Sequence, residues 1–329
     1  MAYSSGSTIL DDDYNIFATG NASGTGDDNT PNVNTVWGSG TGNKGYGQTN
    51  TLSPVSAGTT ITATQWATLL NRISSMASHQ GTSITSITNP TVGDIIEAYN
   101  ALQSNLNSVF SNRLNAASSG SDITSGGSVT GTTSWYTEAK TTTTISFSNS
   151  NAARYFFNAG GIIRLTPVRS GTNNSKSIDW NELADEVGTI AFTNGTSSVI
   201  GGTTFTGTNK LGGSGSIDLI QSNTGFYDLA PGGSEVTIFR QFSDTSPYTA
   251  NFIEVGVSLN SNSDQLTFTM TFRDDAEDVK EDPLGDPNDL DQVQGTTGCD
   301  HVVRQPSTQF ISNSWGTPSI SGSISYITS

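Results

Sequence analysis

Five segments in the second half of the chain alternate apolar and polar residues, and this alternation constrains the fold more than any other sequence feature. The segments read TTTTISFS, IIRLTPV, SEVTIFRQF, NFIEVGVSL and QLTFTMTF. In the second, Ile163 and Leu165 fall on one face and Arg164 on the other, and a period of two is typical of strands with one buried face. Because turns rich in Gly, Asn and Ser separate these strands, the sequence predicts an antiparallel, jelly-roll-like β-sandwich over residues 134–329.

The composition supports a mainly β fold. Hydrophobic residues make up 33% and charged residues 13%, so neutral Ser, Thr, Asn and Gly supply most of the polarity. Thr fits strands, and Gly and Asn accept the positive φ angles of tight turns, whereas a disordered chain is usually rich in Glu, Lys and Pro. With 329 residues the chain is long enough for two or three modules, each with its own core.

Residues 61–115 are predicted to form two helices before the sandwich. In TATQWATLLNRISSMASHQG the apolar residues recur at helical spacing, with Thr64 as the candidate N-cap and Gly81 after the last turn. In the second helix Thr91 and Asp94 have the spacing of a capping box. Its apolar residues step by three and four, and they are Val92, Ile95, Tyr99, Leu102, Leu106 and Val109.

This 3,4 spacing fits two arrangements equally well: a buried hairpin of two helices, and a helical bundle around a symmetry axis. Fibre proteins are commonly three-fold symmetric, and apolar residues at this spacing can pack helices around a three-fold axis. We therefore predict a homotrimer through residues 60–115, with the six apolar residues of the second helix as its interface.

The rest of the first 133 residues lacks a steady period. Residues 1–60 are rich in Gly, Asn and Thr with isolated aromatics, and we interpret them as an extended attachment arm that orders against a partner subunit; a disordered tail is the alternative. Residues 116–133 are small, polar and Gly-rich, which is typical of a linker. The acidic residues 11–13 are interpreted as an N-terminal contact or helix cap.

One short helix is predicted within the sandwich. Asp179 and Glu182 have the spacing of a capping box, Trp180 and Leu183 begin an apolar face, and Gly188 ends the helix. The complete prediction is a mainly β chain with a small helical region: arm, two-helix segment, linker, and a sandwich with this single helix.

The densest apolar stretch is NAARYFFNAGG, which lies between two predicted strands and ends in a double glycine that reverses the chain. Its aromatics, Tyr155, Phe156 and Phe157, each bring about 150–250 Å² of surface. Their favoured role is to fill the core of a module that has few other large apolar residues. A ligand-binding pocket is the alternative.

The charge of the chain argues against two classes of partner. The net charge is −16 and the sequence contains no basic block, so neither a nucleic acid nor an anionic membrane surface is an expected partner. Cys299 is the only cysteine, which excludes an intrachain disulfide, and folding in a reducing cytoplasm is consistent with this. The first residues lack a signal-peptide pattern and no apolar run reaches the length of a membrane span, so we expect a soluble protein.

Catalytic residues are scarce. Cys299 and His301 lie two apart, but a nucleophile and its base must converge with a third, orienting group, which neighbours on one strand rarely do. The other histidine, His79, ends a predicted helix. Phosphate-binding glycine loops, nucleophile elbows and paired metal histidines are not found in the sequence. We therefore expect no enzyme and no cofactor.

The acidic run DDAEDVKEDPLGDPNDLD is the strongest local charge feature. Carboxylate oxygens are typical calcium ligands, and the candidate ligands are Asp286, Asn288, Asp289 and Asp291. The calcium-loop template is not met, because residue 290 is Leu and no glycine stands at the sixth position. A solvated acidic loop is therefore favoured over a metal site.

Several segments resemble virion structural proteins of tailed phages, especially contractile-tailed phages that infect cyanobacteria. The resemblance rests on STILDDDYNIF, TATQWATLLNRI, ARYFFNAGGIIRLT, the FRDD strand end and ISNSWGTPSISGSISY, and it spans most of the chain. It implies a place in the virion, in a tail fibre or baseplate, with other tail or baseplate proteins as partners, and it carries over no catalytic residues.

Three function classes follow for comparison with the structure. The leading hypothesis is a non-enzymatic virion subunit that contacts the host surface. A neck- or capsid-attached fibre or decoration protein without a receptor role is an alternative within this class, and the second class is a carbohydrate-binding module. A glycan-degrading enzyme is the third class, because carboxylates are plentiful, but the sequence does not identify a catalytic pair.

Overall fold

The computed structural model describes residues 10–89, 91, 99–123, 127–171, 174–276 and 292–328. Its helices are α1 (Asp11–Thr19), α2 (Val33–Trp37), α3 (Ala63–Gln80), α4 (Tyr99–Ser111), α5 (Ser150–Asn158) and α6 (Ser175–Val187), with a 3₁₀ turn η1 at Phe226–Asp228. Its strands are β1 (Ser119–Ile123), β2 (Ser128–Gly131), β3 (Glu138–Ser146), β4 (Ile162–Ser170), β5 (Thr189–Phe192), β6 (Ser198–Ile200), β7 (Thr203–Phe205), β8 (Thr208–Leu211), β9 (Leu219–Ile220), β10 (Val236–Phe242), β11 (Phe252–Leu259), β12 (Gln265–Arg273), β13 (Thr296–Pro306) and β14 (Ser319–Ile327). The prediction of a mainly β chain with a smaller helical part is confirmed.

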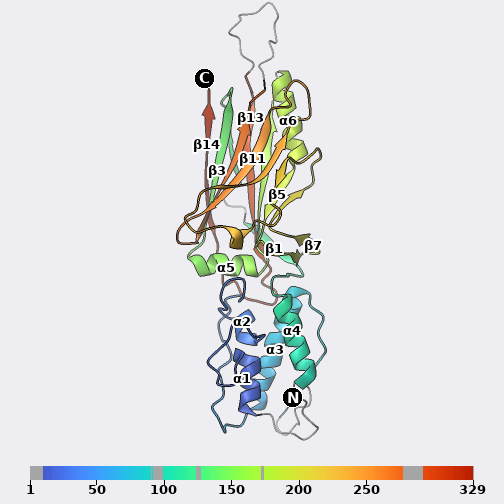
Figure 1. Cartoon of the computed structure of the whole chain (residues 1–329), viewed down its shortest axis with the longest axis vertical. Coiled ribbons are helices and arrows are strands. Elements are labelled where there is room, and N and C mark those ends of the chain that lie inside the picture. The colour runs from blue at the N-terminus through green and yellow to red at the C-terminus, as the bar shows by residue number, and fades with distance from the viewer. Residues whose placement is uncertain are drawn as a thin grey trace, which may run out of the picture.

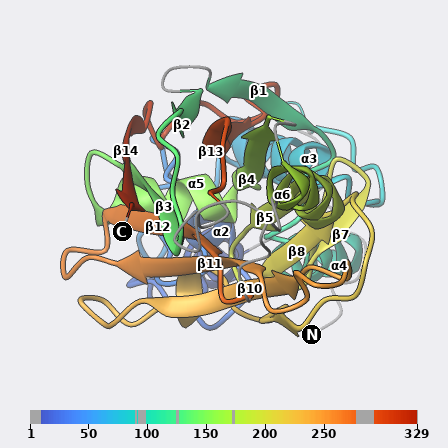
Figure 2. The same ribbon diagram turned by 90° about the horizontal axis from the view of Figure 1, so that it is seen from above.

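Two antiparallel six-stranded sheets form the sandwich in the upper part of Figure 1. One sheet has the order β1-β13-β4-β5-β8, with β2 also paired to β13, and the other has the order β14-β3-β12-β11-β10-β9. Figure 2 shows the sheets end on, with α6 beside β4 and β5. Helix α6 contacts β4 and β11, one strand from each sheet. The predicted antiparallel β-sandwich is confirmed.

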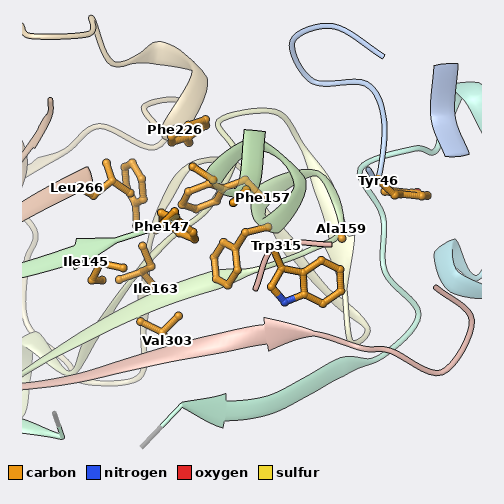
Figure 3. Packing of buried hydrophobic residues seen from close by; sticks show 14 of the residues in the cluster. Tyr46, Ile145, Phe147, Phe157, Ala159, Ile163, Phe226, Leu266, Val303 and Trp315 are labelled. Atoms are coloured by element: carbon orange, nitrogen blue, oxygen red, sulfur yellow. The ribbon is translucent and has the colours of Figure 1, made fainter. Parts of the chain in front are cut away.

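The aromatic stretch forms helix α5, a second helix of the sandwich that the sequence analysis does not predict. It crosses the base of the sandwich (Figure 1). Its N-cap is Asn149, whose side chain accepts a hydrogen bond from the Ala152 N–H. Phe156 and Phe157 are fully buried, and Phe157 stacks on Phe226 with ring centroids 4.7 Å apart (Figure 3). The expected core role of these two phenylalanines is confirmed.

Polar side chains fix where the other helices begin. Asn32 caps α2, Thr62 caps α3 and Asn174 caps α6, each by accepting a hydrogen bond from a backbone N–H of the first turn. Two predicted caps are therefore wrong. The N-cap of α3, Thr62, lies two residues before Thr64, and α6 begins before Asp179, which lies within the helix.

Residues 10–60 fold onto the other helices instead of forming the predicted extended arm. They contain α1 and α2, and Tyr14, Phe17 and Val36 are buried in the same apolar cluster as α3. The predicted acidic cap is present in this segment, because Asp13 accepts a hydrogen bond from the Leu10 N–H at 3.3 Å. The arm prediction is wrong because the apolar residues of this segment find their partners on α3 and α4, which are far away in the sequence: Phe17, for example, packs against Trp66 and Tyr99.

Four side-chain amides hold the irregular parts of this helical region. Each donates to the backbone C=O and accepts from the N–H of one and the same residue, and we call this pattern an amide bridge. The bridges join Asn15 to Val55, Asn34 to Leu52, Asn105 to Thr85 and Gln48 to Ser312, with N···O distances between 2.7 and 2.9 Å. An amide bridge satisfies both backbone groups of a residue that has no strand neighbour. A region with few apolar residues is thereby held in one conformation.

The predicted linker is also wrong, because residues 116–133 contain strands β1 and β2. Both strands pair with β13 and so belong to the sandwich. Their sequences are dominated by Ser, Gly and Thr, and short edge strands of this kind carry too few apolar residues to produce a visible alternation.

The predicted trimer interface is wrong for the three residues that the structure buries. Leu102, Leu106 and Val109 are 0% exposed in the single chain, and α4 packs against α3 as a hairpin. Tyr99 is half-buried with its ring 4.9 Å from that of Phe17. The 3,4 spacing is thus satisfied within the chain. Val92, Ile95 and the expected Thr91–Asp94 capping box lie wholly or partly outside the described residues.

Hydrogen bonds join the helical region to the base of the sandwich. The Asn158 amide of α5 donates to the Gly45 carbonyl at 2.9 Å, and the Tyr227 hydroxyl donates to the Gly42 carbonyl at 2.9 Å. The guanidinium of Arg154 donates to the Gly40 and Gly42 carbonyls. The loop at residues 40–45 is therefore held by the sandwich through its backbone carbonyls.

Candidate functional site

The solvent side of the six-stranded sheet that begins with β14 carries rows of hydroxyl groups. Paired residues of adjacent strands share a face, and two such rows run across β14, β3 and β12. One row is Ser321, Thr144 and Thr267, continued by Ser258 on β11; the next is Ser323 and Thr142, and Thr269, which follows in that row, is buried. We call this surface, with Ser319, Ser325, Ser146 and Thr271 at its margins, the hydroxyl face.

Local sequence explains why these hydroxyls face outward. In β3 the residues alternate between half-buried and buried, so that Thr142 and Thr144 point to solvent while Ala139 and Ile145 point into the core. Strand β14 has the same alternation, with serines outward and Ile324 inward. A β-branched Thr keeps its strand propensity on the exposed side of a sheet.

The geometry of the hydroxyl face is set by the sheet. Side chains of paired residues lie about 4.5–5.5 Å apart across the strands, and alternate residues lie about 7 Å apart along each strand. Within the described residues the hydroxyls of Thr142, Thr144 and Thr267 have no hydrogen-bond partner. Each of these groups can both donate and accept a hydrogen bond, which suits a ligand that is itself rich in hydroxyl groups.

One end of the same sheet surface is charged and aromatic. The Arg240 guanidinium donates to Glu254 at 2.8 Å and lies 5.0 Å over the ring of Phe252. Phe252 is paired with Phe242 across β10 and β11, with ring centroids 5.2 Å apart, and both rings are half-buried. Because Phe252 pairs with Arg273 of β12, the two rings lie two rows beyond the row of Thr142.

A second polar surface is a pocket of about 350 Å³ in the helical region. Its lining is mostly hydroxyl and amide groups and includes the carboxylate of Asp28. That carboxylate accepts hydrogen bonds from the Thr35 hydroxyl at 3.0 Å and from the Thr41 N–H at 2.8 Å. Through these hydrogen bonds Asp28 stabilises the surrounding loops.

Cys299 and His301 do not form a catalytic pair. Both side chains are buried on β13, and burial raises the pKa of the Cys299 thiol to about 12. The thiol is therefore protonated at neutral pH, whereas the thiolate is the nucleophilic form. His79 lies elsewhere, at the boundary between the helical region and the sandwich, with its Nε2 3.1 Å from the Ala159 carbonyl oxygen.

Asp179 on α6 is a buried carboxylic acid whose pKa is raised. Burial raises the pKa of its carboxyl to about 7, while a 2.7 Å hydrogen bond from the Ser243 hydroxyl opposes the rise. A pKa near neutrality is common in catalytic acids. The residue is only 2% exposed, so a substrate has no direct access to it in this conformation.

The candidate calcium ligands Asp286, Asn288, Asp289 and Asp291 lie outside the described residues. In the part of the chain that the structure describes, no group of three or more His, Cys, Asp or Glu side chains is placed to hold a metal ion. None of the described helices is long and apolar enough to span a lipid bilayer.

The sequence contains a signal for the hydroxyl face that the analysis of apolar periodicity passes over. In TTTTIS, QLTFTMTF and SISGSISY, the polar half of the alternation consists almost entirely of Ser and Thr. The pattern identifies each strand, but it does not reveal that these strands are neighbours, because β3 and β12 are more than a hundred residues apart.

Comparison with known proteins gave no match to a protein-family model, to a curated protein or to a solved structure. The hydroxyl face is therefore assessed on its own chemistry.

Proposed function

We propose that the chain is a non-enzymatic structural subunit of a phage virion, of the tail-fibre or baseplate type, that contacts host surface polysaccharide through its hydroxyl face. The resemblance of several segments to virion structural proteins supports the placement in a virion. The hydroxyl face is the observation that carries the contact with polysaccharide.

The arrangement of the two regions supports this role. The helical region and the sandwich lie end to end (Figure 1), and hydrogen bonds from α5 fix the loop between them. In this proposal the helical region is the attachment end. The hydroxyl face lies on the sandwich, which is the outer end of the subunit.

Charge favours a neutral site for such a contact. The chain carries a net charge of −16, and many bacterial surface polymers are anionic, so the chain as a whole repels them. The two central rows of the hydroxyl face contain no ionised side chain, and the charge in the row beside them, on Lys140 between Ser325 and Thr271, is positive. Hydrogen bonding there proceeds without like-charge repulsion at the point of contact. Because each hydrogen bond adds little, several subunits on one virion would bind by avidity.

Placement in the virion is tested by labelling. Antibodies raised against the purified chain should decorate particles of the phage that encodes it, at the tail fibre or baseplate. Labelling at the neck or capsid would replace this assignment with a decoration role, and absence from purified particles would refute it.

The polysaccharide contact is tested separately with purified protein. A variant with Thr142, Thr144 and Thr267 all changed to Val removes three hydroxyls but keeps β-branched side chains of the same shape. We expect the wild type to bind host polysaccharide and to slow phage adsorption, and the triple variant to lose most of both effects.

The matched control changes Thr203 and Thr204, both exposed on β7, to Val. It should bind like the wild type. Equal binding by the triple variant and the wild type would remove the hydroxyl face from the proposal. Release of reducing sugar by the wild type would show that the protein is an enzyme.

A further inference from the structure

Among the described residues, strand β14 is a long strand at the edge of its sheet. The outer strands of the two six-stranded sheets in the described chain are β1, β2, β8, β9 and β14. The first four have two to five residues, whereas β14 has nine. It runs along the side of the sandwich (Figure 1) and pairs, among the described residues, only with β3.

Nothing in β14 blocks a further strand. Natural edge strands are usually shortened, bulged, charged or interrupted by proline, because an open row of N–H and C=O groups pairs with other chains. The sequence of β14, SISGSISYI, contains no charged residue and no proline. Its register against β3 is continuous over all nine residues, unlike that of β1, which has a shift.

The strand is complementary to itself. Two copies of one edge related by a two-fold axis pair antiparallel. With the axis at Ser323, all nine residues find partners, and Gly322 faces Ile324 while Ile320 faces Tyr326. Small residues are thus opposed to branched ones, and a β-branched residue to an aromatic one, which are favourable cross-strand pairs. On the outer face only serines and Ile327 meet.

The self-complementary register points to a second copy as the occupant, and the lack of charge on β14 permits it. Two chains of net charge −16 repel each other over most of their surface, so self-association needs a contact free of charge, and β14 provides one. Ile327, on the outer face at the end of the strand, is 42% exposed and would be covered by the partner's Ser319.

We propose that two copies of this chain associate through β14, joining their six-stranded sheets into one continuous sheet across a two-fold axis. The hydroxyl rows of the two copies then lie side by side on one surface. The association itself does not depend on the proposed function.

The test is the molar mass of the full chain by sedimentation equilibrium or light scattering. The wild type should have twice the chain mass of 34.4 kDa. In Ser323→Lys two ammonium groups face each other across the axis, and like charges directly opposite destabilise a strand pair, so the dimer should be at least about tenfold weaker.

Two further samples separate pairing from misfolding. An equimolar mixture of Ser323→Lys and Ser323→Glu places opposite charges across the axis and should restore the dimer. Thr267→Lys, on the same face but two strands from the edge, should dimerise like the wild type. A monomeric or trimeric wild type, or a mixture that fails to associate, would overturn the proposal; a trimer would instead agree with the oligomeric state predicted from the helices.

Discussion

The helical region and the sandwich reach a defined structure by different means from a similar polar composition. In the sandwich, strand ladders satisfy the backbone and aromatic rings fill the space between the sheets, as around Phe157. In the helical region, long segments have no strand partner, and amide bridges such as that of Asn15 satisfy the backbone instead. The comparison shows that asparagine can act as a structural residue where apolar residues are few.

The difference has a consequence for the effect of substitutions. A core residue of the sandwich contacts many neighbours, so its loss leaves a cavity. An amide bridge contributes two specific hydrogen bonds, so its loss leaves two backbone groups without partners. The predictions below test these mechanisms in each region and at their boundary.

The largest effect is expected for Phe157→Ala in the sandwich. The side chain is fully buried and contacts the rings of Phe156, Phe192 and Phe226, so truncation should lower the free energy of unfolding by about 3–5 kcal/mol. Chemical denaturation followed by circular dichroism measures the change. Tyr155→Ala, at a half-buried neighbour, should cost distinctly less. A Phe157→Ala variant as stable as the wild type, with loss of glycan binding, would favour the pocket alternative.

The boundary between the regions should make stability depend on pH through His79. Burial lowers the pKa of its imidazole to about 4, while the contact with the Ala159 carbonyl opposes the shift. In the unfolded chain the imidazole takes up a proton below pH 6.5, but in the folded chain it stays neutral until about pH 4. The neutral imidazole therefore makes its full contribution to the free energy of unfolding above pH 6.5, and this contribution is lost as the pH falls towards 4.

The measurement compares wild type with His79→Gln between pH 6.5 and pH 4. Because one pKa unit corresponds to about 1.4 kcal/mol, the wild type should lose roughly 2–3 kcal/mol more than the variant over this range. Parallel pH profiles of the two proteins would show that the imidazole is not held neutral at the boundary.

A smaller effect is expected for Asn15→Ala in the helical region. The change removes an amide bridge and leaves the buried N–H and C=O of Val55 unpaired, which should cost about 2 kcal/mol. The control is Asn21→Ala, because the Asn21 side chain is half-buried and its solvent-exposed hydrogen bonds reach only nearby residues; the change should alter stability by less than about 0.5 kcal/mol. If both variants unfold like the wild type, amide bridges do not support this region.

No effect is expected from the acidic loop of the sandwich. Changing Asp286, Asp289 and Asp291 together to Asn should leave the melting temperature unchanged with or without calcium, because the sequence predicts a solvated acidic loop here and such a loop contributes little to stability. Differential scanning calorimetry is the measurement. A rise of several degrees when calcium is added to the wild type, abolished in the triple variant, would establish a metal site in this loop.

Sequence reasoning identified five strands of the sandwich, β3, β4, β10, β11 and β12, but not β13 or β14, and it misjudged the segments before the sandwich. The alternation in segments such as QLTFTMTF depends on residues two apart, which the sequence displays directly. The wrong predictions of an extended arm at residues 1–60 and of a linker at residues 116–133 have one cause. The described residues of both segments are held by contacts with residues far away in the chain. The helix α5 was missed although Asn149, its N-cap, precedes a run of residues compatible with a helix.

The candidate site was predictable only in part. The sequence contains the Ser and Thr residues of the hydroxyl face, and it shows that they alternate with apolar residues. It does not show that Thr144 lies between Ser321 and Thr267, because strand order results from packing of the whole sandwich. The predicted interface residue Leu106 illustrates the opposite error, because a 3,4 spacing is the same whether the partner helix belongs to the same chain or to another.

The sequence by itself determined the local properties of this protein: where strands alternate, which helices are amphipathic, and how acidic the chain is. These properties depend on the backbone period of two or 3.6 residues and on charge, which neighbouring residues define. Only the tertiary structure decided which strands are adjacent, that Leu106 is covered by its own chain, and that β14 is left at an edge. Those outcomes depend on contacts between distant residues, whose free energies are set by the packing of the entire chain.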